Sequence, residues 1–184
     1  MRILNRISLF LSSFAPLFLL IILKEIIEIL NQNWSINFLN IFLLIFLFIL
    51  FNLGVFGLFF NIHKIKKSNG KKIKIIFRKN NTDQHFLGYF SLFVLFAVTF
   101  EIEMYSMAII FFLILIFIGI VYIKNDMYYI NPLLNMLGYS FYCVNVVIDD
   151  KDNELCVFYK GAIEANKEYI ILDTFKNFII VKDV

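Results

Sequence analysis

The sequence predicts an α-helical membrane protein with four transmembrane helices and a small β-rich unit on the cytoplasmic side. Four long apolar runs cover residues 7–23, 38–60, 86–100 and 107–123. A membrane-spanning helix needs about 20 mostly apolar residues, so the second run is amply long and the first and fourth are adequate. The third run is long enough only if Gln84, His85 and Glu101 lie at the membrane interfaces.

Composition supports this fold class. The chain has 24 Phe among 184 residues, is 61% hydrophobic and has a mean hydropathy of +0.82. A water-soluble domain of this size needs more polar surface to cover itself. The composition therefore excludes a soluble protein.

The distribution of basic residues predicts the orientation. Sixteen of the 17 Lys and Arg residues lie in the N-terminal tail, in the loop between the second and third runs, or after the fourth run. Lys24 is the exception. Cytoplasmic loops of membrane proteins are enriched in bases, so both termini and the middle loop are expected in the cytoplasm of a bacterial cell, with the chain in the inner membrane. No cleavage site follows the first run, which we interpret as a retained helix extending to about Leu30.

The apolar runs contain little polar chemistry. No ionisable residue lies near the middle of any run, which argues against proton- or ion-coupled transport. Asn52, Gly54 and Gly57 are candidate helix-packing residues, because glycines allow close approach and an amide can bond across an interface. The alternative is an Asn52 side chain satisfied within its own helix.

The loop expected outside the cell holds two acidic residues and no base. Glu101 and Glu103 are candidates for sensing an external cation or a phage component. The plainer interpretation is a pair of solvated loop charges.

A basic loop at residues 62–84 dominates the cytoplasmic side. Its bases are candidate contacts for a partner or for lipid: Lys64, Lys66, Lys67, Lys71, Lys72, Lys74, Arg78 and Lys79. They are expected to fix the orientation and to touch anionic lipid. A docking surface for an acidic partner is the second interpretation. Direct nucleic-acid binding is not expected, because no aromatic residues interleave with the bases to form a stacking platform.

The cytoplasmic segments also predict β-structure. Ser68-Asn69-Gly70 is a strong hairpin signal, so we predict a hairpin from residues 63–67 and 71–77, with Ile73, Ile75 and Phe77 on its apolar face. Four further strands are predicted near residues 141–148, 154–159, 167–172 and 178–181. The resulting organisation is a transmembrane domain at 1–127, an interfacial connector at 128–140 and a β-rich domain at 141–184. Asn131-Pro132 is expected to start a short amphipathic segment in the connector, although a simple linker is nearly as well supported.

The sequence shows no catalytic, cofactor-binding or metal-binding constellation. His63 and His85 have no Ser, Cys or carboxylate at a spacing typical of a catalytic triad. Cys143 and Cys156 do not form a C-x-x-C pair; they would face each other across a predicted hairpin, but the reducing cytoplasm favours buried thiols. We therefore expect no enzymatic activity.

The layout resembles the KwaA family, the membrane component of the bacterial Kiwa anti-phage system. The resemblance depends on length, on four spans with both ends inside, and on two segments, Ser12-Ser13-Phe14-Ala15-Pro16-Leu17 and the nine residues from Asn131 to Tyr139. It implies a membrane-embedded homo-oligomer, a tetramer, that senses phage attack at the envelope. It also implies a soluble DNA-binding effector, KwaB, held on the cytoplasmic side.

These observations lead to a non-enzymatic membrane sensor and scaffold of an anti-phage complex as the main hypothesis. The alternatives are a permease subunit, a bacteriocin-immunity protein or a pore-forming effector. An oligomer could line a pore with Ser12, Ser13 and Asn52.

Overall fold

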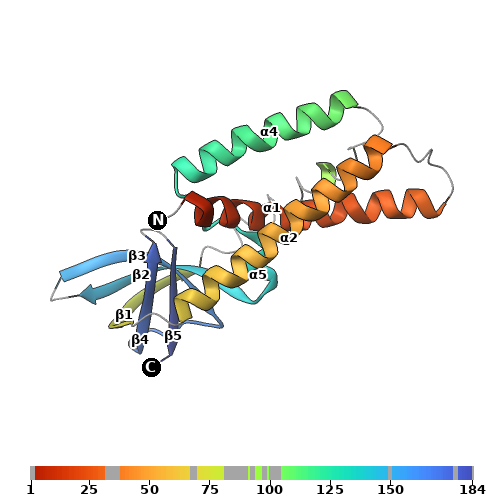
Figure 1. Cartoon of the computed structure of the whole chain (residues 1–184). Helices are drawn as coiled ribbons and strands as arrows, with labels where there is room; N and C mark the ends of the chain where they lie inside the picture. Colours follow the sequence, from red (N-terminus) through yellow and green to blue (C-terminus); the bar gives the residue numbers. More distant parts are fainter. Residues whose placement is uncertain are drawn as a thin grey trace.

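Three long helices extend to one side of a small β-barrel (Figure 1). The computed structural model describes residues 3–31, 38–66, 70–80, 91, 94–96, 99, 105–148, 151–175 and 178–183. The long helices are α1 (Ile3–Leu30), α2 (Phe38–Lys66) and α4 (Tyr105–Lys124). Each is long and apolar enough to cross a membrane.

The described residues thus give three candidate spans rather than the predicted four. The predicted span at 86–100 lies mostly outside the described residues, of which 91, 94–96 and 99 are helical there. The outer candidates Glu101 and Glu103 also lie outside the described residues.

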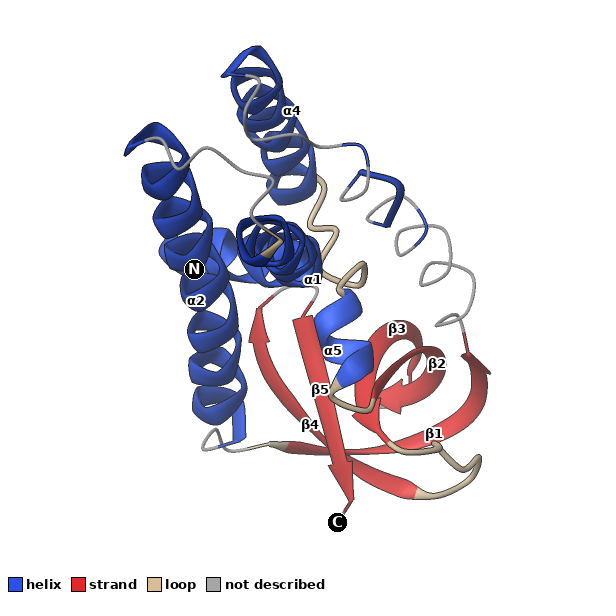
Figure 2. Ribbon diagram, turned by 90° about the vertical axis from the view of Figure 1, so that its right-hand side faces the viewer, coloured by secondary structure: helices blue, strands red, loops and turns tan. Residues whose placement is uncertain are grey.

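Helix α1 forms the centre of the helical part. Two thirds (67%) of its most apolar stretch is buried within the chain, compared with 17% for α2 and 28% for α4. Figure 2 shows α1 between α2 and α4. Helix α1 is therefore held mainly by protein contacts, whereas α2 and α4 present apolar side chains outward.

The β unit is a closed five-stranded barrel, which confirms the predicted small β unit. Its strands are β1 (Lys71–Asn80), β2 (Tyr139–Ile148), β3 (Lys151–Lys160), β4 (Glu168–Phe175) and β5 (Phe178–Asp183). The order around the barrel is β1-β2-β3-β5-β4; β3 and β5 are parallel and all other neighbours are antiparallel. Strand β1 comes from the middle loop, so the barrel closes only by using both the middle loop and the C-terminal segment.

The predicted hairpin around Ser68-Asn69-Gly70 is wrong in its first half. Residues 63–66 continue helix α2, and the middle loop supplies one strand instead of two. Ile62 and Ile65 are both buried, at the spacing of one helix face, so packing extends the helix past the membrane-length run. His63, Lys64 and Lys66 then stand in the last turn, where the helix dipole favours positive charge.

The barrel interior follows the predicted alternation of β1 as far as Ile75. Ile73 and Ile75 point inward and are buried. The register shifts between Ile75 and Phe77, and both Ile76 and Phe77 are exposed. A β-bulge inserts one extra residue and reverses the faces beyond it. The prediction that Phe77 lies on the buried face is therefore wrong.

Cys143 and Cys156 stand directly opposite each other on β2 and β3, as predicted, with Cα atoms 4.1 Å apart. The structure joins them in a disulfide rather than leaving two thiols. Cys143 is half-buried and Cys156 is exposed, which corrects the expectation that both are buried.

Candidate functional site

The connector between α4 and the barrel is built around a short helix, α5 (Pro132–Met136). Asn131 caps its first turn by accepting a hydrogen bond from the Leu134 amide at 3.2 Å, and Pro132 occupies the first helical position, where proline is favoured. Gly138, at φ +82°, ends the segment in the left-handed conformation that glycine adopts at no steric cost. Helix α5 therefore starts at the predicted Asn131-Pro132 turn and leads directly into β2.

The same Asn131 side chain ties this connector to the central helix. Its Nδ2 donates to Ser12 Oγ at 2.7 Å, and Ser12 Oγ donates in turn to the Leu9 carbonyl oxygen at 2.7 Å. Both side chains are buried, with Asn131 2% exposed and Ser12 0% exposed. A buried polar group that loses its partner costs about 1–3 kcal/mol, so this pair holds α1 and α5 in a defined register.

Ser12 lies in a turn of α1 that is weakened from within. Pro16 stands inside the helix, four residues after Ser12, and has no amide hydrogen to donate to the Ser12 carbonyl oxygen. Ser13 Oγ donates to the Phe10 carbonyl oxygen at 2.7 Å, within the same turn. Helices bend most readily where proline interrupts their hydrogen bonds, and the contact with α5 lies on the turn that Pro16 interrupts.

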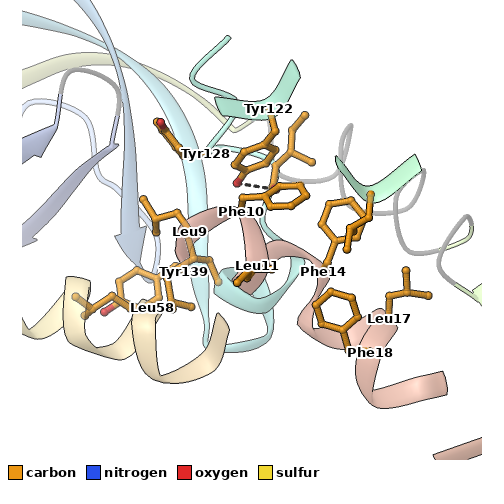
Figure 3. Packing of buried hydrophobic residues seen from close by; sticks show 14 of the residues in the cluster. Leu9, Phe10, Leu11, Phe14, Leu17, Phe18, Leu58, Tyr122, Tyr128 and Tyr139 are labelled. Carbon is orange, nitrogen blue, oxygen red and sulfur yellow. Dashed lines mark hydrogen bonds between the residues drawn. The ribbon is translucent and has the colours of Figure 1, made fainter. Parts of the chain in front are cut away.

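Aromatic rings of α1, α4 and the connector pack together in the same apolar cluster; Figure 3 shows Phe10, Tyr122 and Tyr128 among them. The Tyr122 ring at the end of α4 packs edge-on against Phe10 of α1 at 5.4 Å and against Tyr128 at 5.7 Å. On the barrel side, Phe141 stacks on Tyr129 at 5.4 Å and contacts Phe158 at 5.2 Å. We call the contact between Ser12 and Asn131, together with these ring contacts, the junction.

Burial raises the pKa of Tyr128 to about 12, and the nearby Asp126 carboxylate adds to the rise, whereas the positive charge of Arg6 opposes it. Asp126 also forms an ion pair with Arg6 of α1 at 3.5 Å. The start of α1 and the end of α4 are thus linked beside the junction.

The outer face of the barrel carries a second group of residues. Lys71, Lys72, Lys74 and Lys79 of β1 are exposed, and so are Lys64 and Lys66 at the end of α2. Lys67 lies outside the described residues, and nothing is described of the Arg78 side chain, although its backbone belongs to β1. The structure therefore places most of the predicted bases along one strand and the adjoining helix end.

Two apolar side chains stand among these bases. At the bulge, Ile76 is 45% exposed and Phe77 is 58% exposed, between Lys74 and Lys79 in the chain. We call Lys74, Ile76, Phe77 and Lys79 the β1 surface. Positive charge beside exposed apolar side chains is suited to binding a protein that offers carboxylates around an apolar pocket.

Comparison with known proteins gives the family. The family described as "Anti-phage protein KwaA" matches residues 5–181. The chain belongs to the KwaA family of anti-phage proteins. The Kiwa protein KwaA of Escherichia coli O55:H7 is 27% identical to it over 152 residues, which cover 78% of this chain and 76% of that protein. No solved structure matches the chain.

Membership of the KwaA family gives the chain a role in anti-phage defence, and the three apolar helices indicate a membrane protein. The two segments that carried the resemblance, one starting at Ser12 and the other at Asn131, meet at the junction, although these residues are 119 positions apart. Their residue types have a structural explanation: a bond across elements, a helix cap and a proline that weakens one turn.

Two of the three candidate packing residues of α2, Gly54 and Gly57, lie against α1. A Cβ atom on Gly54 would lie 2.7 Å from the Leu11 carbonyl oxygen, and one on Gly57 would overlap Ser8. Asn52 Nδ2 instead donates to the Phe48 carbonyl oxygen at 2.7 Å, within its own helix. Asn61, which the sequence analysis did not single out, makes the bond across the helices, donating to Ser8 Oγ at 3.0 Å.

Sequence reasoning missed the contact between Ser12 and Asn131. Serine is common in membrane helices, and Asn-Pro is a common turn, so neither residue alone signals a contact. The one available signal was the proline four residues after Ser12. Among the described residues, no group of three or more His, Cys, Asp or Glu side chains could hold a metal ion.

Proposed function

We propose that the chain is a non-enzymatic membrane sensor and scaffold, which detects infection at the cell envelope and holds a soluble DNA-binding effector at its barrel. The observation that carries the proposal is the buried Ser12–Asn131 bond, because it joins the central membrane helix to the segment that leads into the barrel. A disturbance of α1 would therefore reach the segment that leads into the barrel through this contact.

The β1 surface supports the scaffold part of the proposal. β1 pairs with β4 over residues 71–74 and with β2 over residues 74–80, so each part of the strand has a neighbour in the barrel. We expect a partner to bind the outward side chains of this strand. Lys74 and Lys79 attract carboxylates, and Phe77 offers an apolar anchor of the kind that dominates binding energy at protein interfaces.

The junction supports the sensor part. The contact lies on the α1 turn that Pro16 weakens, and aromatic rings of the neighbouring segments pack against one another, Phe10 on Tyr122 and Tyr129 on Phe141. Coupling between distant sites requires an element with two arrangements that both sites bias. The α1 turn at residues 9–16 is the element that we assign to this role.

The proposed arrangement in the cell follows the distribution of bases. The barrel, both termini and the β1 surface would face the cytoplasm, because Lys and Arg concentrate at that end of the helices. The chain would work as a homo-oligomer, a tetramer, in the bacterial inner membrane. It would bind no nucleic acid directly and would leave that task to its partner.

The proposal is tested by affinity purification of the tagged full-length chain from cells that also express the neighbouring defence genes. Phe77→Ser and Lys74→Glu should each lower recovery of the soluble partner and protection against phage, while the chain stays in the membrane fraction. Lys160→Glu is the matched control, since Lys160 is an exposed base on β3, away from the β1 surface. Equal partner recovery from all three variants and the wild type would contradict a docking role for β1.

A further inference from the structure

An apolar groove of about 980 Å³ runs between α2 and α4 over the side of α1. Its walls include Phe46 of α2 and Phe112 and Ile116 of α4, and Phe10 of α1 forms part of its floor. The volume is at the upper end of the range of about 300–1,000 Å³ for small-molecule sites. The lining is apolar along its length except at one end, where Arg6 and Lys124 stand.

The length of the groove matches one leaflet of a bilayer. Along α4 it extends from Phe112 to Lys124, which is about 18 Å at a rise of 1.5 Å per residue. The hydrocarbon core of a bilayer is about 30 Å thick, so one leaflet accounts for about 15 Å of it. On α4 the groove thus reaches from the membrane surface at Lys124 to about the depth of the bilayer midplane, whereas on α2 its lining continues to Phe42, four residues after the start of that helix.

The charged end of the groove is suited to a phosphate. Arg6 and Lys124 supply two positive charges at the end of the helices nearest the barrel, and Asp126, 3.5 Å from Arg6, supplies one negative charge. The end therefore keeps a net positive charge. Basic pockets between transmembrane helices bind the head groups of anionic lipids.

The chain does not cover this groove with any residue that the structure describes outside α1, α2 and α4. Phe96, from the segment before α4, packs at 5.2 Å on Phe111, a residue of α4 that does not line the groove. Gly119 lines the floor, where an added Cβ would lie 3.0 Å from the Phe10 ring. The absence of a side chain there brings α4 close to α1 at the base and leaves the space above open.

We propose that this groove binds one anionic glycerophospholipid, with its phosphate between Arg6 and Lys124 and an acyl chain between α2 and α4. The length of the groove, its apolar walls and the paired cations at a single end are the three features that select this occupant. The site is separate from the β1 surface, and its occupation does not depend on the recruitment of a partner.

The test is native mass spectrometry of the full-length chain in mixed micelles that contain phosphatidylglycerol and phosphatidylcholine with the same acyl chains. The wild type should retain phosphatidylglycerol preferentially. Lys124→Gln should reduce that preference about fivefold, since each base near a membrane surface contributes about that factor. Lys66→Gln, at the end of α2 on the same side of the membrane, should leave it unchanged.

A second pair of variants tests the acyl part of the site. Ile116→Trp places a larger side chain in the groove and should lower retention of both lipids, whereas Ile109→Trp, also exposed on α4 but outside the groove, should not. Equal retention of the two lipids by the wild type would overturn the proposal. So would an Ile116→Trp variant that changes the oligomer mass with lipid retention intact, because a second copy of the chain would then fill the groove.

Discussion

The barrel buries its apolar side chains in its interior, whereas the helices expose side chains of the same types on their outer faces. Val144, Val157 and Tyr169 are each 0% exposed inside the barrel, whereas Ile109 is 63% exposed and Phe117 67% exposed on α4. The barrel buries its own core and can face water. The helices complete their burial only in an apolar solvent, and the bilayer supplies one.

The region where the two parts meet shows how they are joined. The outer face of β2 and β3 carries Phe141 and Phe158, which belong to the same apolar cluster as the helices and not to the barrel interior. In five-stranded barrels of the OB type, the face of the second and third strands binds oligonucleotides or oligosaccharides. In this chain part of the corresponding face packs on the connector, so β1 offers the larger exposed surface for a partner.

The largest expected effect is a loss of barrel stability from a substitution that leaves the helices intact. Ile75→Ala should destabilise the barrel by about 2–5 kcal/mol, because Ile75 is 0% exposed and its removal leaves a cavity. Ile76→Ala is the matched control, because the neighbouring Ile76 is 45% exposed. Hydrogen exchange of the β2 and β3 amides in the detergent-solubilised chain measures the difference. Similar protection in both variants would contradict the assignment of the barrel interior.

The next effect separates the helices and leaves the barrel intact. Gly54→Val should lower the free energy of unfolding of the helical part by about 1–3 kcal/mol, because the new side chain meets the backbone of α1 at Leu11. Gly119→Val should cost less, since the nearest atoms belong to the Phe10 ring, which can move. The melting temperatures of both variants in one detergent test this. A lower value for Gly119→Val would place the tight helix contact at α4 instead of α2.

A smaller effect concerns pH and the barrel alone. Burial, together with the hydrogen bond from its hydroxyl to Asp183 at 3.0 Å, raises the pKa of Tyr159 to about 12. The folded barrel holds this proton more tightly than the unfolded chain does. The contribution of the Tyr159 hydroxyl to the stability of the barrel is therefore complete below about pH 10 and is lost as the pH rises to about 12.

Tyr159→Phe cannot titrate at this position. Its barrel stability should therefore fall less steeply between pH 10 and pH 12 than that of the wild type, as measured by unfolding at a series of pH values. Parallel slopes would show that Tyr159 has an ordinary pKa in the folded chain. Tyr128, whose pKa is also raised, remains in both proteins and cancels in the comparison.

Local patterns predicted the elements of this fold better than their contacts. The length of α1, to Leu30, and the places of the C-terminal strands follow from runs of one period, which a sequence displays directly. Residues 63–66 were assigned to a strand because a hairpin turn follows them; the buried spacing of Ile62 and Ile65 decided for helix. The exposure of Phe77 depends on a one-residue bulge that alternation alone cannot reveal.

The candidate site likewise has a part that the sequence predicts and a part that it does not. The bases of β1 were predicted because charge is visible in the sequence, although Arg78 and Lys67 lie partly or wholly outside what the structure describes. The Ser12–Asn131 bond joins residues 119 positions apart, and no local period connects them. Which polar residues of a membrane helix carry a contact is decided by the packing of distant elements.

The central claim is that the junction couples the helices to the barrel. The most direct test is to measure protection against phage in cells that express Ser12→Ala or Ser13→Ala. Both serines are buried on adjacent positions of α1, but Ser12 accepts the bond from Asn131, whereas Ser13 donates within its own helix. Ser12→Ala should lower protection about tenfold, as expected for a coupling free energy of 1–3 kcal/mol, while the partner still co-purifies. Ser13→Ala should protect like the wild type. Equal protection by the two variants at the same membrane level would contradict the account.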